Sequence, residues 1–127
     1  MAKKIDFKNK TLLKLRSENI QKGFEVVKDL LIENEQVIAS YVSIRDRLVF
    51  TNGRIISVNV QGITGSKIDF TSIPYKKIQM YSVETVGTID FDSEFIIWIS
   101  GMGEFKFELS GNSDIIGLSK LISRYIL

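Results

Sequence analysis

The stretch from Arg45 to Gln79, RDRLVFTNGRIISVNVQGITGSKIDFTSIPYKKIQ, decides the fold. Residues 46–51 and 54–60 are two runs rich in β-branched and other apolar residues, and they flank Asn52 and Gly53. Asn-Gly between two such runs predicts a hairpin, because a type I′ turn needs a positive φ at both central residues. No phosphate-loop spacing surrounds Gly53, so we interpret it as a turn residue and not as part of a phosphate cradle.

The strand pattern continues on both sides of this hairpin. Apolar residues that alternate with polar ones, or follow one another in short runs, predict further strands at 35–43, 66–70, 77–86, 94–100 and 104–110. In 66–70 we expect Ile68 and Phe70 to face the interior and their polar neighbours to face outward. Trp98 lies between isoleucines in the most apolar run, which predicts a buried tryptophan in a strand covered on both faces.

Helical periodicity marks both ends of the chain. Apolar residues recur every three or four positions from Ser17, which we expect as the N-cap, to Leu31. A short turn at 11–15 is expected to lead into this helix. A second helix is expected from Asn112 or Ser113 to the C-terminus, with one apolar stripe to bury. Helix, about seven antiparallel strands and helix is the element order of an α+β fold.

The composition limits the chemistry. The chain has 127 residues, of which 44% are hydrophobic and 25% charged, which is typical of soluble globular domains. Histidine and cysteine are absent, so the commonest general base, the commonest transition-metal ligand and the thiolate nucleophile are all missing. No G-x-S-x-G motif positions a serine either. We therefore predict that the protein is not an enzyme and has no cofactor.

Positive charge is concentrated at the N-terminus. Residues 1–16 carry six basic side chains and one acidic one, whereas the formal net charge of the whole chain is +2. Such an arm can contact anionic lipid by counterion release, and a solvated, frayed terminus is the structural alternative. The rest of the chain is acidic on balance, so we expect no nucleic-acid partner. Neither a signal peptide nor an apolar run of roughly 18 residues is recognisable, so we expect a cytoplasmic protein.

Three segments together resemble the bacterial pleckstrin-homology family. They are LVFTNGRIISVNVQGITGSKIDFTSIPYKKIQMYSVET at 48–85, FDSEFIIWISGMGE at 91–104 and DIIGLSKLISRYIL at 114–127. The resemblance implies a seven-stranded antiparallel barrel of two sheets, capped at one end by the C-terminal helix. The N-terminal helix is additional to that barrel. We expect one domain overall, with the basic arm and helix at 1–34 and the barrel with its C-terminal helix at 35–127.

The resemblance also bears on partners. Eukaryotic relatives that hold inositol phosphates use basic residues on the first hairpin loop. Here that hairpin is expected to be tight, near 43–46, and it offers Arg45 and Arg47 but no lysine-rich loop. Members of the bacterial family tend to assemble as rings of identical subunits, so the resemblance implies a homo-oligomeric ring. The N-terminal helix is expected to dock on its own barrel or on a neighbour's.

Two sets of side chains are candidates for contacts with a partner. Basic side chains that could hold an anionic headgroup or a phosphate are Lys3, Lys4, Arg45, Arg47, Lys76 and Lys77. For the last two, protection of a sheet edge is the structural alternative. Apolar side chains that we expect on loops or outer faces, and hence in an interface, are Ile63, Met80, Val86 and Ile89.

One acidic motif raises the question of a metal. Asp90, Asp92 and Glu94 alternate along the chain, so on a strand they would share one face and could clamp a divalent cation. The motif lacks the glycine and the downstream glutamate of an EF-hand loop. We therefore predict no metal site, and interpret the motif as a solvated loop or as half of a salt link between subunits.

These observations lead to two hypotheses about function. The first is a non-catalytic domain that acts as a self-assembling scaffold or protein-interaction module, with copies of itself and an unidentified protein as partners. The alternative is peripheral binding of an anionic membrane or a phosphate-containing ligand through the basic arm and the surface lysines and arginines. Salt-sensitive binding to anionic lipid is expected from the second hypothesis and not from the first.

Overall fold

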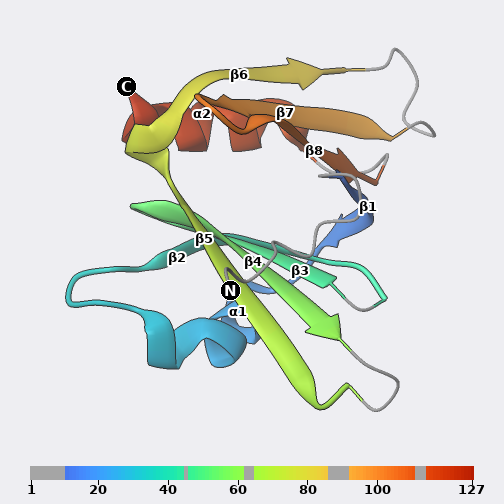
Figure 1. Cartoon of the computed structure of the whole chain (residues 1–127), viewed down its shortest axis with the longest axis vertical. Helices are drawn as coiled ribbons and strands as arrows, with labels where there is room; N and C mark the ends of the chain where they lie inside the picture. The colour runs from blue at the N-terminus through green and yellow to red at the C-terminus, as the bar shows by residue number, and fades with distance from the viewer. Residues whose placement is uncertain (1–10, 45, 62–64, 86–91, 111–113) are drawn as a thin grey trace.

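The computed structural model describes residues 11–44, 46–61, 65–85, 92–110 and 114–127. Its strands are β1 (Thr11–Ser17), β2 (Val37–Val42), β3 (Asp46–Thr51), β4 (Arg54–Gln61), β5 (Lys67–Pro74), β6 (Ile78–Glu84), β7 (Ser93–Ile99) and β8 (Gly103–Leu109). The helices are α1 (Ile20–Val27) and α2 (Ile115–Ile126), with short 3-10 turns η2 (Lys28–Leu30) and η3 (Tyr75–Lys77). The strands form one sheet in the order β5-β4-β3-β2-β1-β8-β7-β6, which folds into two facing halves (Figure 1).

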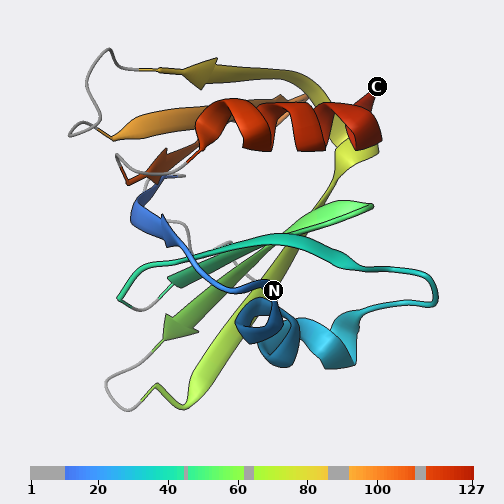
Figure 2. The same cartoon turned by 180° about the vertical axis from the view of Figure 1, so that it is seen from behind.

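Strand β1 joins the two antiparallel halves of this sheet. It pairs parallel with β8 and then antiparallel with β2. Within the pairing with β8 the register shifts between Leu12 and Leu15, and Lys14, which lies in this interval, has a φ of 57°. An irregularity of this kind bends a strand, and β1 passes from the upper to the lower half in Figure 2. The prediction of seven antiparallel strands is therefore corrected, because the described residues form eight strands in a mixed sheet. The turn expected at 11–15 is wrong, because these residues belong to β1.

Aromatic rings fill the space between the two halves. The ring centroid of Phe95 lies 6.2 Å from those of Phe50 and Phe107, and 6.4 Å from that of Tyr81. The strand predicted at 104–110 is confirmed as β8, and its apolar residues Phe105, Phe107 and Leu109 are buried. These contacts couple strands from both halves of the sheet into one core.

Helix α2 caps this core, as predicted. It packs against β6, β7 and η3, and it contributes Ile115, Leu118 and Ile122 to the core. Its N-cap is Asp114, whose side chain accepts a hydrogen bond from the backbone N–H of Gly117. The expected N-caps, Asn112 and Ser113, lie outside the described residues.

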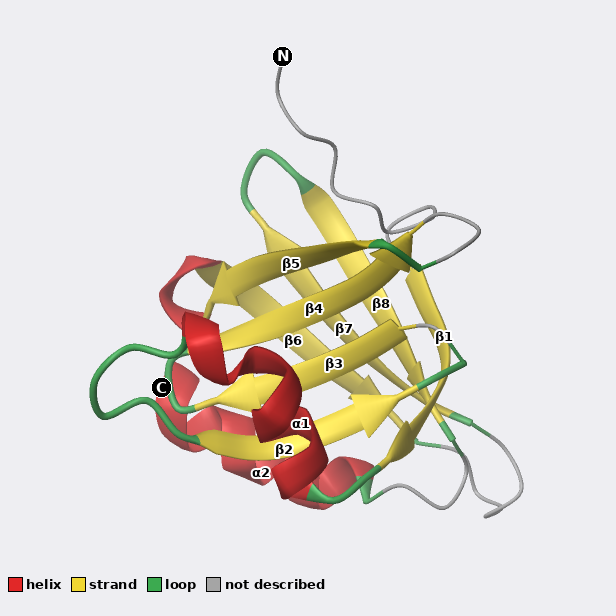
Figure 3. Ribbon diagram, turned by 90° about the horizontal axis from the view of Figure 1, so that it is seen from below, coloured by secondary structure: helices red, strands yellow, loops and turns green. Residues whose placement is uncertain are grey.

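Helix α1 covers the outer face of the lower half, over β2 and β3 (Figure 3). Val27 of the helix packs with Val49, Ile56 and Val58 in a second apolar cluster on that face. The helix begins after Asn19, whose side chain accepts a hydrogen bond from the N–H of Gln21. The predicted N-cap Ser17 is wrong, because that residue belongs to β1.

The β3–β4 hairpin is confirmed, but its predicted turn type is wrong. Asn52 and Gly53 are not among the residues with positive φ. Instead, Oγ1 of Thr51 accepts hydrogen bonds from the N–H groups of Gly53 and Arg54, both at 3.1 Å. A side-chain acceptor of this kind closes a turn without the left-handed backbone of a type I′ turn. The side chain of Asn52 is used elsewhere, as an acceptor for the N–H of Gln36.

The prediction for β5 is wrong, because the face that was expected to point inward points outward. Ile68 and Phe70 are 49% and 37% exposed, whereas Asp69 is buried and accepts a hydrogen bond from Thr71. The reason is the strand's C-terminal half, where Ile73 enters the core and fixes the alternation for the whole strand. The prediction that Trp98 is buried is also wrong, because it faces outward and is half-buried.

A glycine at the contact between α1 and β2 gives a test of this packing. A Cβ on Gly23 would lie 2.6 Å from the Cβ of Ser40. We expect Gly23→Ala to lower the free energy of unfolding by up to about 2 kcal/mol, because an overpacking cost of about 1–3 kcal/mol exceeds a helix-propensity gain of about 1 kcal/mol. Urea denaturation measures the change. Gly53→Ala is the matched control, because a Cβ there meets nothing within 4 Å, and a stabilised Gly23→Ala variant would contradict the packing.

Candidate functional site

In the part of the chain that the structure describes, the sheet ends in two edge strands without a further pairing partner. In the described part of the chain, β5 pairs only with β4 and β6 pairs only with β7. An edge strand presents a row of backbone N–H and C=O groups with which another strand can pair. Although β5 and β6 are consecutive in sequence, η3 leads the chain from one half of the sheet to the other, so they form opposite edges (Figure 1).

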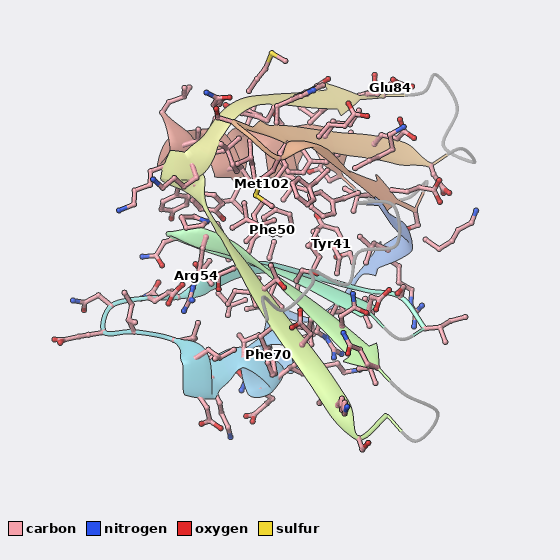
Figure 4. The ribbon with its side chains drawn as sticks, in the orientation of Figure 1. Tyr41, Phe50, Arg54, Phe70, Glu84 and Met102 are labelled. Carbon is pink, nitrogen blue, oxygen red and sulfur yellow. The ribbon has the colours of Figure 1, made fainter. Side chains whose placement is uncertain are left out.

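Apolar side chains are exposed on both edge strands. On β5 these are Ile68 and Phe70, and Figure 4 places Phe70 on the outer side of the lower half. On β6 it is Met80, which is 54% exposed and stands opposite Trp98 of β7. The structure thus places Met80 on an outer face, as predicted, and adds Trp98 beside it. The other expected interface residues, Ile63, Val86 and Ile89, lie outside the described residues.

Charged side chains on the upper half form ion pairs with one another. The Nζ of Lys106 lies 3.7 Å from a carboxylate oxygen of Glu94, and the Nζ of Lys14 lies 3.2 Å from one of Asp92. The hydrogen bond to Asp92 raises the pKa of Lys14. Two members of the acidic motif thus face lysines, while Asp90 lies outside the described residues. Within the described ranges, no three acidic side chains gather as metal ligands would.

Of the predicted anion-contact residues, the structure describes Arg47, Lys76 and Lys77, and these three do not converge on one site. Arg47 donates two hydrogen bonds to the carboxylate of Glu18, from Nε to Oε2 and from Nη2 to Oε1. Lys76 and Lys77 both lie exposed on η3, not on a strand. Lys3, Lys4 and Arg45 lie outside the described residues. Among the described members, only the two lysines of η3 are neighbours.

The pair of Arg47 and Glu18 fastens the start of α1 to the sheet. The carboxylate of Glu18 also accepts a hydrogen bond from the hydroxyl of Ser40, at 2.7 Å. Burial alone would raise the pKa of Glu18, but the hydrogen bonds from Arg47 and Ser40 outweigh it and lower the pKa. A guanidinium bound by one carboxylate through Nε and Nη2 has its charge balanced within the protein.

A second arginine fastens the other end of the helical segment. Arg54 donates from Nε and Nη2 to the two carboxylate oxygens of Glu35, both at 2.8 Å, and from Nη2 to the backbone oxygen of Leu30. Its Nη1 donates to Oγ of Ser72 on β5. Arg54, labelled in Figure 4, therefore ties the segment after α1 to the β3–β4 hairpin and to an edge strand.

The environment of Glu35 determines its charge. Its side chain is only 5% exposed, and burial alone would raise its pKa. Hydrogen bonds from Arg54, from the hydroxyl of Thr51 and from the N–H of Ile32 oppose this and lower the pKa to about 2. Glu35 is therefore a permanently ionised structural carboxylate and not a candidate general acid or base near neutral pH.

A groove of about 420 Å³ runs beside this arginine, between the segment that follows η2 and the β3–β4 turn. Its charged lining groups are Glu33, Glu35 and Arg54. Because the guanidinium is already bound by Glu35, Leu30 and Ser72, the groove offers little positive charge to an anionic ligand. Within the described ranges of the chain, no helix has the length and apolar character needed to cross a bilayer.

Sequence reasoning missed several residues that shape these surfaces. Ile68 and Phe70 were expected in the core, although counting the alternation back from Ile73 would have placed them outside. Glu18 and Glu35 were not recognised as partners of arginines, because pairs separated by 29 and 19 positions leave no local pattern. Only the tertiary fold brings them together.

Removing the carboxylate of Glu35 tests its assigned role. The folded pKa of about 2 lies below the ordinary 4.5, so the unfolded state binds more protons between these values. The stability that Glu35 contributes is complete above about pH 5 and is lost as the pH falls toward 2. We expect Glu35→Gln to lower the free energy of unfolding by about 3 kcal/mol at pH 7. The difference in the free energy of unfolding between this variant and the wild type should become smaller as the pH is lowered to 3.5. Denaturation curves recorded across this pH range measure it.

Glu25→Gln is the control, because Glu25 pairs with Lys28 on the surface of α1. It should change stability and its pH dependence much less, since solvent screens an exposed pair. A gap between Glu35→Gln and the wild type that stays constant from pH 7 to pH 3.5 would contradict the role given to Glu35.

Comparison with known proteins places the chain in a family. A family model described as the bacterial PH domain matches residues 6–126. The chain is 53% identical over 77 residues to the uncharacterised protein YjqA of Bacillus subtilis strain 168, which covers 61% of this chain and 62% of YjqA. The alignment thus spans less than two thirds of YjqA. The chain is also 24% identical to the uncharacterised protein YozO of the same strain, over 76% of this chain and 83% of YozO.

Solved structures agree with this assignment. A protein with a pleckstrin-homology domain from Shewanella loihica PV-4 is 37% identical, with a TM-score of 0.79 over 91% of this chain and 100% of that chain. A pleckstrin-homology domain from Shewanella amazonensis SB2B is 40% identical, with a TM-score of 0.67 over 87% and 90%. A PH-domain protein from Exiguobacterium sibiricum 255-15, at 20% identity and a TM-score of 0.69 over 89% and 62%, shares the fold. The chain belongs to the bacterial pleckstrin-homology domain family.

Proposed function

We propose that this protein is a non-catalytic module that assembles with copies of itself through its two free sheet edges and serves as a scaffold for other proteins. The observation that carries the proposal is the exposure of Ile68 and Phe70 on one edge strand and of Met80 on the other. Natural proteins usually protect edge strands with charged residues, proline or covering loops. Apolar side chains on both edges instead favour pairing with another chain.

The two edges differ, and this determines the kind of assembly. When β5 of one copy meets β6 of the next, the contact is head-to-tail. Repetition of a head-to-tail contact generates a closed ring if the rotation closes, and then no protomer retains a free edge. The outward pair of Met80 and Trp98 would lie next to such a contact, where aromatic and methionine side chains are enriched in interfaces.

The chemistry of the chain supports a non-catalytic role. Histidine and cysteine are absent from the sequence. Glu18 and Glu35, whose side chains are 7% and 5% exposed, are each bound by an arginine that fixes the fold. The relatives of known structure are described by their pleckstrin-homology domain and not by a reaction.

The alternative proposal is peripheral binding to an anionic membrane. It rests on the basic side chains of residues 1–16 and on the exposed Lys76 and Lys77. Arg47 weakens it, because that guanidinium is bound by Glu18. We favour self-assembly, because it would bury the apolar side chains that are exposed on the two edge strands. Exposed lysines, by contrast, are ordinary on protein surfaces.

Light scattering after size-exclusion chromatography tests the assembly. We expect the wild type at micromolar concentration to have a mass that is a multiple of 14.4 kDa. Phe70→Lys combined with Met80→Lys should reduce the mass to one chain, because each lysine places a charge on an edge. Ile44→Lys is the matched control, since Ile44 is 97% exposed at the β2–β3 turn, away from both edges.

A wild-type mass of one chain would contradict the proposal. A multimer that survives the double substitution would contradict the assignment of the interface to the edges. A single-chain mass together with co-sedimentation with anionic vesicles that weakens as salt is added would favour the membrane alternative.

A further inference from the structure

An apolar groove lies where the sheet does not close. It has a volume of about 250 Å³ and is bounded by the C-terminal half of β5 on one side and by the β7–β8 turn on the other. Its apolar walls are formed by Ile73, Ile99, Met102 and Phe105. In Figure 4, Met102 lies between the upper and lower halves of the molecule.

The backbone of the β7–β8 turn places Met102 at this groove. Gly101 and Gly103 have φ values of 81° and 87°, which side chains rarely adopt, so glycine is needed on both sides of the methionine. The N–H of Met102 donates to the carbonyl of Ile99 and closes the turn. A methionine side chain adapts its shape to different apolar partners, which suits the wall of a binding site.

The groove has one charged lining residue among those that the structure describes, Lys77. Its side chain is exposed, and it forms no ion pair with another described residue. Ile73 and Phe105 are nearly inaccessible to solvent at the floor. The described lining of the groove therefore combines apolar side chains with a single exposed lysine.

We propose that this groove binds a monocarboxylate with a short aliphatic chain. The chain lies between Ile73, Ile99 and Met102, and the carboxylate lies at the ammonium of Lys77. Charge complementarity selects an anionic head, and the apolar walls select the tail. Apolar cavities of about 150 Å³ already accept benzene, so this volume is sufficient for a chain of several methylene groups.

Two other occupants fit the groove less well. An apolar side chain of a second copy would come from an edge contact, but the exposed Ile68 and Phe70 lie toward the other end of β5. A chain still embedded in a bilayer would have to enter a recess whose floor is almost completely buried. The inference is thus independent of the proposed self-assembly and concerns a ligand free in solution.

Octanoate below its micelle concentration is a suitable probe. With ¹³C-labelled methionine methyl groups, we expect the Met102 signal to shift in a saturable titration and the Met80 signal to stay, because Met80 lies on the outer face of β6. Lys77→Ala should weaken octanoate binding about threefold, as expected for one partly exposed ion pair. Lys76→Ala is the matched control and should leave binding unchanged, because Lys76 is not among the lining residues.

Octanol provides the second arm of the experiment. It should bind more weakly than octanoate to the wild type, and Lys77→Ala should remove this difference while it leaves octanol binding unchanged. The titration is repeated with the Phe70→Lys/Met80→Lys variant, where an unchanged Met102 response shows that the groove does not depend on the edge contacts. A Met102 signal that never shifts, equal losses in Lys76→Ala and Lys77→Ala, or a response only to vesicles would each overturn the proposal.

Discussion

The parallel pairing of β1 with β8 is the constraint on which the rest of the structure depends. Without it, β2–β5 and β6–β8 would be two antiparallel sheets with no strand pairing between them. The bend at Lys14 lets one strand pair with both halves, so that they face each other and enclose Phe95 and its aromatic neighbours. A left-handed residue other than glycine costs about 1–2 kcal/mol. Here the Lys14 N–H donates to Glu108 and its ammonium faces Asp92, which offsets part of that cost.

The two partly buried arginine–glutamate pairs keep the guanidinium groups of Arg47 and Arg54 from binding a ligand. Arg47 and Arg54 are bound by Glu18 and Glu35, at the two ends of the segment that contains α1. They hold the helix against β2 and β3, and Gly23 allows the close approach. As a result α1 covers one outer face of the sheet. The edges, the upper outer face and the groove beside β5 remain for contacts with other molecules.

Much of the fold could be predicted because its determinants are local. Apolar residues that recur at every second position indicate the strands β3, β4 and β8. Apolar residues that recur every three or four positions indicate the buried stripe of α2. Strand β1 could not be recognised, since its leucines do not alternate and its pairing with β8 joins segments about 95 residues apart. The faces of β5 were misassigned because Ile68 and Phe70 are as apolar as core residues. They are exposed because Ile73 of the same strand lies in the core, and the alternation of side chains then turns Ile68 and Phe70 to the outer face.

The candidate site was harder to predict than the fold. Met80 was placed on an outer face from the sequence, but Trp98 beside it was expected in the core, because an unbroken apolar run does not reveal which face is covered. The groove at Met102 combines residues from β5, η3 and the β7–β8 turn, and no local pattern links them. The alternation of side chains along one strand does not show which other elements will lie beside its end, so a surface formed by several elements cannot be predicted from it.

Hydrogen exchange of the edge strands, followed by mass spectrometry over a range of protein concentrations, tests the central claim most directly. If copies pair through these edges, the amides of 67–74 and 78–84 become more protected as concentration rises, while those of the central strand β3 do not change. Edge amides that exchange at the same rate at every concentration, from dilute to millimolar protein, would contradict the account.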